Sequence, residues 1–207
     1  VPYDEVTKED WEEDETTPTI RYKAKRCRHG LNYTMGPGEL SEQISVPFRE
    51  ADYLHRVYHR KHPELQKWWD WTFEKVKKER QLFNAYGRRL RLLERLDPAM
   101  LSSLVAFYPQ STIGDKVSRC IYLCESDPDW PTGKARMALN IHDALISLHD
   151  LEVGEQVRKV MKRHAEEPLQ IEGIDGITRE LVIECDLKAS VADEQGIHRW
   201  SGLQKVK

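Results

Sequence analysis

The sequence contains no long hydrophobic run. No stretch approaches the roughly 18 consecutive apolar residues that a membrane-spanning helix needs, and the start lacks the apolar segment of a secretory signal. Hydrophobic residues make up 39% of the 207 residues, which is enough for a globular core. We therefore expect a soluble, cytoplasmic protein without a membrane partner.

Cysteine is scarce as well. The four cysteines form neither Cys-x2-Cys pairs nor the regular spacing of a disulfide framework. This excludes a disulfide-stabilised secreted scaffold and argues against a structural zinc site. The sequence therefore predicts reduced thiols at Cys27, Cys120, Cys124 and Cys185.

An overall excess of positive charge is also missing, since the net charge is -3 at pH 7. The charge is nevertheless unevenly distributed. Residues 1–20 carry eight acidic side chains against one lysine, whereas cations outnumber acids two to one between Arg21 and Arg95. Because a basic stretch of this kind can follow a nucleic-acid backbone, we expect contact with nucleic acid.

A regular pattern lies at the start of the basic stretch, where Arg21, Lys25, His29 and Tyr33 recur every four residues. On a helix, this spacing places all four side chains on one face. An ordinary amphipathic helix would place apolar residues there. The two cations suit a polyphosphate, and the two rings suit a base or sugar further along. The sequence therefore predicts a nucleotide-binding helix that starts near Thr17 and ends before the glycines at 36–38.

The rest of the chain shows helical patterns first and strand patterns later. Further helices are expected near residues 39–44, 48–61, 64–80, 97–125 and 152–166. Strands are expected at 136–141, 145–149, 169–171 and 178–188, and the end at 196–207 is expected to be irregular. The predicted fold class is α+β, a mostly helical region followed by a small antiparallel sheet.

Two groups of side chains have simple structural interpretations. The three tryptophans Trp68, Trp69 and Trp71 are expected in the core rather than as platforms for stacked bases. The three histidines have a spacing that could bring them together on one helix face, but no further metal ligand is evident. We expect a solvated basic face at His55, His59 and His62.

Several of these motifs resemble family A DNA polymerases, in the same order along the chain. The run Arg21-x3-Lys25-x3-His29-Gly-x2-Tyr33 is similar to the motif of the fingers domain in that family. Further along, the chain resembles the Gly-Arg-Arg turn, the Gln-Gly-Thr-Ala-Ala-Asp helix, the His-Asp-Glu palm motif and the C-terminal tail of the family. The matching segments are 86–89, 108–115, 141–143, and 168–169 with Trp200.

The resemblance implies roles for the residues of the first motif. Arg21 and Lys25 would grip the triphosphate of an incoming dNTP, and Lys25 would also donate a proton to the departing pyrophosphate. His29 would stack on the incoming base and sugar. Tyr33 would close the pocket over the templating base.

The later motifs imply contacts with DNA and with metal. The resemblance places His142 at the primer end and makes Asp143 a ligand of catalytic Mg²⁺ in a mechanism that uses two ions. It also implies contacts with primer–template DNA through four further side chains, Arg88, Arg89, Gln110 and Thr112.

The resemblance implies an organisation in three parts. Residues 1–16 would form an acidic surface segment, residues 17–80 the fingers helices and residues 81–207 the C-terminal part of the palm. The second metal-binding Asp of the family has no counterpart in residues 1–20. We expect that Asp, the rest of the palm and the thumb to come from an upstream or partner polypeptide, as in a split phage-like polymerase. The chain alone is expected to be inactive.

Three positions depart from the family pattern. His29 replaces the usual aromatic residue, so discrimination between sugars is left open. Thr34 replaces a Gly, and Ala144 replaces the Glu that follows the palm Asp.

Two other functions are compatible with the residues. One is a fragment of a single-subunit phage-type RNA polymerase, which shares the spacing of the helix motif and a His-Asp palm motif. The other is a non-catalytic nucleic-acid-binding module derived from a polymerase. The missing second Asp and Ala144 favour the module, whereas the intact nucleotide-binding stripe argues against it.

Overall fold

The computed structural model describes residues 20–192, 195 and 197–206. These residues form two compact units, and neither is continuous in sequence. Unit 1 comprises Val1–Phe83 and Arg89–Pro109, and unit 2 comprises Asn84–Arg88 and Gln110–Lys207. The expected acidic segment at 1–16 and the expected helix start near Thr17 lie outside the described residues.

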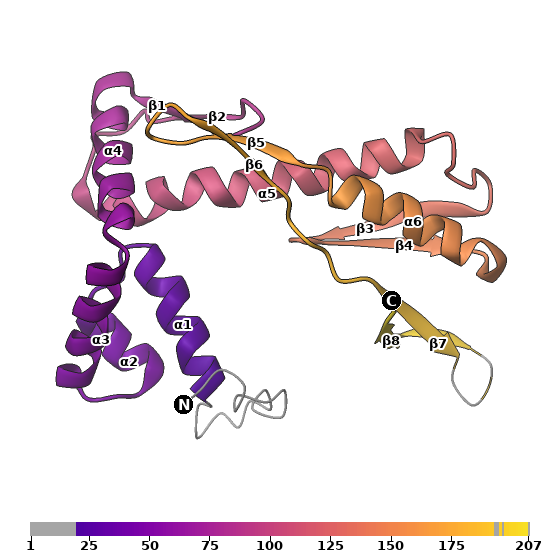
Figure 1. The fold of residues 1–207 in the computed structure, drawn as a ribbon, viewed down its shortest axis with the longest axis horizontal. Coiled ribbons are helices and arrows are strands. Elements are labelled where there is room, and N and C mark those ends of the chain that lie inside the picture. The colour runs from indigo at the N-terminus through magenta and orange to yellow at the C-terminus, as the bar shows by residue number, and fades with distance from the viewer. Residues whose placement is uncertain (1–19, 193–194, 196, 207) are drawn as a thin grey trace. The chain divides into compact units, whose positions relative to one another are not determined.

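Unit 1 begins with a cluster of three helices (Figure 1). They are α1 (Ile20–Asn32), α2 (Pro37–Ile44) and α3 (Phe48–Lys61). Prolines start α2 and precede α3, because a proline fits the first turn of a helix, where no backbone N–H is needed. A small apolar core joins the three helices through the buried side chains of Leu31, Leu40, Ile44 and Ala51.

The rest of unit 1 consists of α4 (Pro63–Glu79), a short hairpin and the first part of α5 (Leu101–Ser126). The hairpin pairs β1 (Gln81–Phe83) with β2 (Arg89–Arg91), and the β2 strand was not predicted. Asp97 caps the 3₁₀ turn before α5 by accepting from the backbone N–H of Ala99 at 2.8 Å. The core of this part is formed by Val76, Leu82, Leu92 and Leu104.

The three tryptophans of α4 have different environments. Trp69 is buried, which confirms the expectation, and its indole N–H donates to the backbone carbonyl of Asn32 at 3.1 Å. Trp68 and Trp71 are half-buried and stack on each other, with ring centroids 5.4 Å apart. All three therefore serve packing within unit 1.

The solvated face expected at His55, His59 and His62 is wrong for His59. Both ring nitrogens of His59 are buried, and they have no hydrogen-bond partner among the described residues. Its ring lies against His55 at 4.5 Å and Trp69 at 5.1 Å. The expectation failed because Trp69 reaches α3 from the next helix, a tertiary contact that the spacing of the histidines does not reveal.

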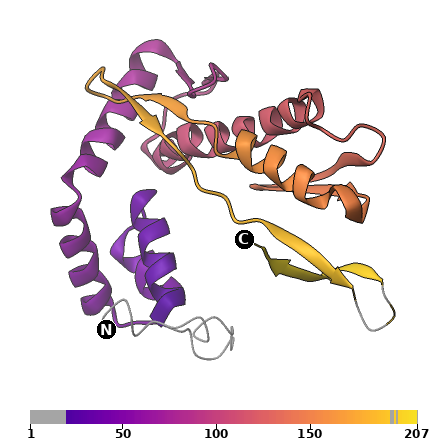
Figure 2. The same ribbon diagram turned by 45° about the vertical axis from the view of Figure 1, so that its right-hand side comes forward.

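Unit 2 packs the second part of α5 and helix α6 (Gly154–Ala165) against the β3–β4 hairpin (Figure 2). The hairpin pairs β3 (Ala135–Ile141) with β4 (Ala144–His149), as predicted. Its core contains the buried side chains of Cys120, Cys124, Trp130, Val157 and Val160. All four cysteines are free in the structure.

Two further hairpins complete unit 2 and correct the predicted strands. One pairs β5 (Leu169–Glu172) with β6 (Thr178–Leu181), and the other pairs β7 (Lys188–Ala192) with β8 (His198–Lys205). The single strand expected at 178–188 is wrong, because residues 182–187 form no regular structure. The irregular end expected at 196–207 is also wrong, since β8 covers most of it.

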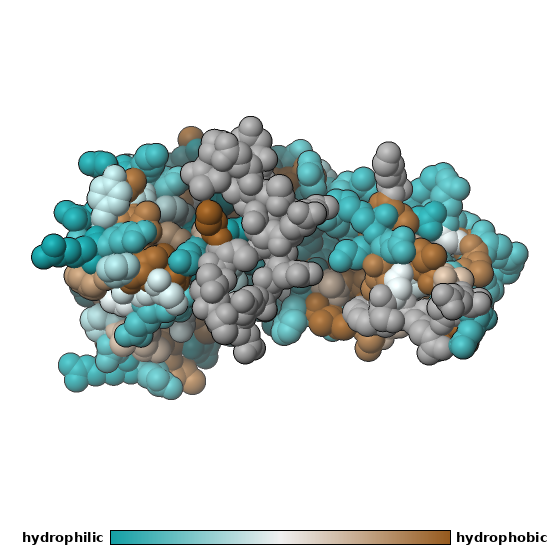
Figure 3. Space-filling model, turned by 90° about the horizontal axis from the view of Figure 1, so that it is seen from below, coloured by the Kyte–Doolittle hydropathy of each residue, from teal (hydrophilic) through white to brown (hydrophobic). Residues whose placement is uncertain are grey.

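The α+β class is confirmed, but the strands of the described residues form separate two-stranded sheets rather than one sheet. Hydrophobic side chains reach the surface in patches within a mostly hydrophilic exterior (Figure 3). No helix in the described part of the chain is long and apolar enough to cross a membrane.

Candidate functional site

The predicted nucleotide stripe lies on α1 and the turn that follows it. Lys25 and His29 are exposed, whereas Arg21 and Tyr33 are half-buried. The rings of His29 and Tyr33 meet edge to face with centroids 5.0 Å apart. Burial raises the pKa of the Tyr33 phenol. The opposite face of α1 is held by buried Leu31, so the helix has one core face and one polar face.

The end of α1 fixes the position of Tyr33. The backbone N–H groups of Tyr33 and Met35 both donate to the carbonyl of Gly30, at 2.9 and 3.0 Å. These bonds resemble a Schellman cap, in which the residue after the cap adopts a left-handed conformation. That residue is Thr34, with φ 70°. A glycine would adopt this conformation without strain, so the family pattern has a physical basis at this position.

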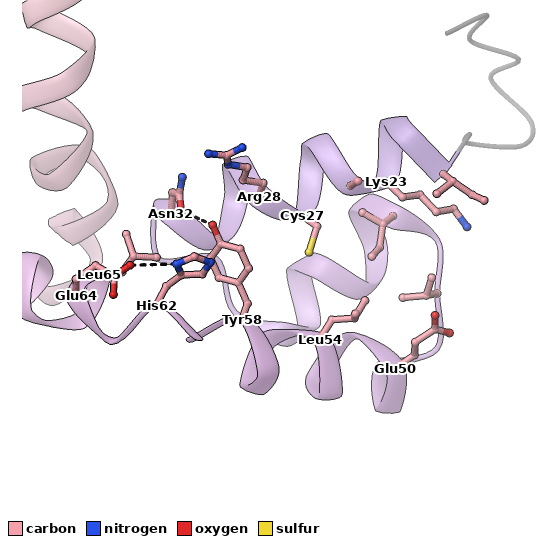
Figure 4. A pocket seen from close by; sticks show the side chains of 14 residues that line it. Lys23, Cys27, Arg28, Asn32, Glu50, Leu54, Tyr58, His62, Glu64 and Leu65 are labelled. Atoms are coloured by element: carbon pink, nitrogen blue, oxygen red, sulfur yellow. Dashed lines mark hydrogen bonds and ion pairs between the residues drawn. The ribbon is translucent and has the colours of Figure 1, made fainter. Parts of the chain in front are cut away.

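Asn32 anchors the same end of α1 from two sides. Its side-chain carbonyl accepts from the Tyr58 hydroxyl at 2.7 Å, and its backbone carbonyl accepts from Trp69. Between α1 and α3 lies a groove of about 950 Å³, with Cys27 and Arg28 on one wall and Leu54 on the other (Figure 4). None of the four stripe residues lines this groove.

His142 and Asp143 form the two-residue turn between β3 and β4. Ile141 pairs with Ala144, so the turn projects both side chains from the tip of the hairpin, where they are exposed. His142 has φ 54°, a conformation that His, Asn and Asp adopt more readily than other non-glycine residues. The turn therefore gives Asp143 a fixed backbone platform.

The carboxylates of the described residues do not complete a site for a pair of Mg²⁺ ions. No group of three or more His, Cys, Asp or Glu side chains in the described part of the chain could hold a metal. The neighbour of Asp143 on β4 is Ala144, which offers no ligand. Asp143 thus belongs to no metal-binding cluster among the described residues.

The predicted DNA contacts around the Gly-Arg-Arg turn have different environments. Arg88 is exposed but forms a two-pronged ion pair with Asp115 on α5, and both of its Nε distances to that carboxylate are 2.9 Å. The hydrogen bond from Arg88 holds the pKa of the Asp115 carboxyl below its usual value. Gln110 and Arg89 are exposed. Thr112 is buried, with its hydroxyl oxygen accepting from the backbone N–H of Ala85 at 3.3 Å.

The predicted site residues are divided between the two units. Unit 1 contains Arg89 and the four stripe residues on and after α1, whereas unit 2 contains the other predicted contacts. Within unit 2, Thr112 contacts the turn that carries Arg88 through the backbone N–H of Ala85. The unit 2 residues are Arg88, Gln110, Thr112, His142 and Asp143.

Sequence reasoning missed Asn84. Its side chain is buried, and its amide and carbonyl join the Arg88 turn to α5. The signal that could have found it is an Asn three residues before a Gly, which is typical of a turn closed by an Asn side chain.

The sequence is similar to known DNA polymerases over most of its length. The model of DNA polymerase family A matches residues 5–190. DNA polymerase I of Deinococcus radiodurans is 26% identical over 157 residues, which are 73% of this chain and 16% of that protein. The thermostable DNA polymerase I of Thermus aquaticus is 26% identical over 152 residues, 70% of this chain and 18% of that protein. The chain thus spans less than a fifth of the length of these relatives.

Among solved structures, the fold is similar to the POL domain of Pol1 from M. smegmatis, in a complex with DNA primer-template and dNTP. The TM-score is 0.66 at 19% identity, over 79% of this chain and 28% of that chain. This likeness shows a shared fold. Because the family model covers most of the sequence, the chain belongs to DNA polymerase family A.

Proposed function

We propose that this chain takes part in template-directed DNA synthesis, supplying the nucleotide-binding helix and one catalytic carboxylate. The observation that carries the proposal is α1. One of its faces is fixed in a core, and the opposite face keeps the Arg21, Lys25, His29 and Tyr33 series of the family. Fixed cations on a rigid helix can stabilise the charge that develops on a triphosphate without reorganising.

The roles of the stripe follow its order along α1. Arg21 and Lys25 bind the triphosphate of the incoming dNTP, and Lys25 donates a proton to the pyrophosphate that leaves. His29 stacks on the base and sugar, and its edge-to-face contact with Tyr33 supports this arrangement. Tyr33 closes the pocket on the side of the templating base.

In unit 2, His142 contacts the primer end and Asp143 contributes one ligand to a pair of Mg²⁺ ions. Such ions would stabilise the attacking and leaving oxygens of the phosphoryl transfer. Gln110, Arg88 and Arg89 bind the primer–template DNA. Thr112 supports the turn that carries Arg88, because its buried hydroxyl contacts that turn.

The second carboxylate and the rest of the palm come from an upstream polypeptide, in the same or a separate chain. The β3–β4 hairpin supports this proposal. Leu139, Ile141 and Leu148 are 56%, 42% and 51% exposed, and pairing places the first two on the same face as Ile146 and Ala144. The other face packs on the core of unit 2 through Ala135, Met137 and Leu145. An apolar sheet face beside a lone carboxylate suits a polypeptide partner.

A polymerase-derived module that binds nucleic acid without catalysis is the second candidate. The specific observation in its favour is the incomplete set of metal ligands around Asp143. In that case Asp143 and the stripe residues would take no part in catalysis.

Single-nucleotide primer extension tests the proposal. The chain is assayed alone and with its native upstream polypeptide, in the presence of Mg²⁺ and with dNTPs and NTPs in parallel. We expect extension only in the combined sample, with dNTPs, and loss of extension with Asp143→Asn at nearly unchanged DNA affinity. Asp150→Asn, at the other end of the same hairpin, is the matched control and should extend normally.

The alternative outcomes are distinct. Extension with NTPs would point to RNA synthesis. DNA binding without extension in the combined sample would favour the non-catalytic module. Extension by Asp143→Asn at the wild-type rate would exclude Asp143 as a metal ligand.

A further inference from the structure

The turn at residues 84–88 is organised by one buried side chain. The Asn84 side-chain carbonyl accepts from the backbone N–H groups of Tyr86 and Arg88, at 3.0 and 2.9 Å. Its amide donates to the Ser111 hydroxyl at 3.0 Å and to the Asp115 carboxylate at 2.7 Å. Because Asn84 is only 5% exposed, these bonds are shielded from water. Asn84 therefore fixes both the turn and the carboxylate of Asp115.

Asp115 in turn fixes the Arg88 guanidinium. The Nε of Arg88 lies 2.9 Å from both carboxylate oxygens, and its Nη2 donates to one of them. A two-pronged pair between a guanidinium and a carboxylate constrains orientation as well as distance. Asp115 is 14% exposed and Arg88 is 60% exposed, so the pair presents the cation outward.

Part of the guanidinium remains available to a ligand. An arginine carries five N–H donors, two of them on Nη1. Among the described residues, the hydrogen bonds of the Arg88 side chain involve Nε and Nη2. The Nη1 donors are thus held in a defined direction at the surface.

We propose that Asp115, held by Asn84, is a positioning residue that orients Arg88 toward an acceptor on primer–template DNA. This rests on the proposed function, in which Arg88 binds DNA. Asp115 itself does not touch the DNA. It restricts the guanidinium to one orientation, so that less conformational entropy is lost when the DNA binds.

The direction of the change in DNA affinity when Asp115 is replaced separates the positioning role from simple charge repulsion. Removing a negative charge close to a DNA-binding surface should strengthen DNA binding, since it lowers repulsion of the phosphates. A positioning role predicts the opposite. Asp115→Asn replaces one of the two acceptor oxygens by an NH₂ group, which cannot accept from the guanidinium, so the two-pronged pair cannot form.

The test measures the dissociation constant for primer–template DNA by fluorescence anisotropy, at several salt concentrations. It uses the full chain and then the chain with its upstream polypeptide. We expect Asp115→Asn and Arg88→Ala each to weaken binding roughly tenfold, the usual scale for one specific arginine contact. The double variant should bind no more weakly than Arg88→Ala alone. Arg88→Lys should also bind weakly, because lysine keeps the charge but not the planar fork.

Glu155→Gln is the matched control. It removes a carboxylate from an exposed ion pair with Lys159, at 2.7 Å on α6 of the same unit. It should leave DNA affinity unchanged or slightly stronger. Thermal melting of each variant, followed by circular dichroism, detects any general loss of folding.

Each other outcome overturns either the DNA contact of Arg88 or the positioning role of Asp115. If Arg88→Ala binds DNA as tightly as the wild type, the proposed DNA contact of Arg88 fails. If Arg88→Ala is weak but Asp115→Asn binds normally or more tightly, the positioning role fails. An additive loss in the double variant, or wild-type affinity of Arg88→Lys, would also overturn positioning.

Discussion

Thr34 is a β-branched residue in a conformation that suits glycine. Its φ of 70° lies in the left-handed region, where the branched side chain crowds the backbone. The conformation persists because the Schellman-like cap at the end of α1 requires it. The helix that carries the nucleotide stripe therefore ends in a strained residue.

We expect Thr34→Gly to stabilise the chain by about 1 kcal/mol, because relief of strain exceeds the flexibility that glycine adds to the unfolded chain. The melting temperature should rise. Thr178→Gly, on strand β6, is the control, and it should lower the melting temperature because glycine weakens strands. A Thr34→Gly variant that melts at or below the wild-type temperature would contradict the assignment of strain.

His59 gives unit 1 a dependence on pH. Burial lowers its pKa below the ordinary value of 6.5, and the neighbouring His55 and His62 lower it further. The folded state therefore favours neutral imidazole, whereas the unfolded chain protonates near the ordinary value. The stability that this provides is complete above pH 6.5 and is lost as the pH falls through the lowered pKa.

The prediction concerns thermal melting between pH 7.5 and about pH 5. Wild-type melting should fall on acidification, and His59→Phe should reduce this fall because the ring stays in place without a titrating group. An equally steep decline in His59→Phe would assign the acid sensitivity to other groups.

At the scale of elements, helix α1 has two distinct surfaces, the stripe proposed to bind the nucleotide and the groove that α1 forms with α3. Lys25 belongs to the stripe, and Lys23 lines the groove between α1 and α3. If the stripe binds the triphosphate, Lys25→Ala should reduce the rate of nucleotide addition by about 100-fold while DNA affinity changes little. Lys23→Ala, on the same helix, should retain most of the rate. Single-turnover extension measures the rate of nucleotide addition, and fluorescence anisotropy measures DNA affinity. A larger loss of DNA affinity than of rate would show that Lys25 contacts the DNA backbone instead of the triphosphate.

The helices could be predicted because their ends carry local signals. Pro37, Pro47 and Pro63 mark three helix starts, and Asp97 caps the turn before α5. These signals act within a few residues, so the sequence alone contains them. The β3–β4 hairpin was likewise visible as two apolar segments around a polar pair.

Strand pairing near the C-terminus was harder to predict from the sequence. The break after Leu181 depends on where β6 stops pairing with β5, which begins at Leu169. Strand β8 pairs with β7 across a loop and lacks a regular alternation of apolar residues, so no local pattern marks it.

The site was only partly predictable for a similar reason. Motif spacing identified α1 and the turn at Asp143, because both are local. The burial of Thr112 and the contacts of Asn84 depend on how α5 packs against the Arg88 turn. Side chains that support a site are determined by tertiary contacts that no single motif contains.

At the scale of the whole molecule, the exposed face of the β3–β4 hairpin tests the partner proposal. We expect Leu139→Glu to weaken association with the upstream polypeptide at least tenfold, since a carboxylate would be buried in an apolar interface. Melting of the chain alone should change little, because Leu139 is already 56% exposed. Leu93→Glu is the control, at a leucine of unit 1 that is 82% exposed. Analytical ultracentrifugation measures the association, and equal behaviour of the two variants would exclude this face.

The chain passes between the two units three times, after Phe83, after Arg88 and after Pro109. No single cut in the gene therefore leaves both units intact. A break between residues 83 and 110 would remove the Arg88 turn from one unit or the β2 strand from the other. Exchange of one unit by a single crossover would therefore break the other unit. The two units are thus interleaved in sequence across residues 84–109.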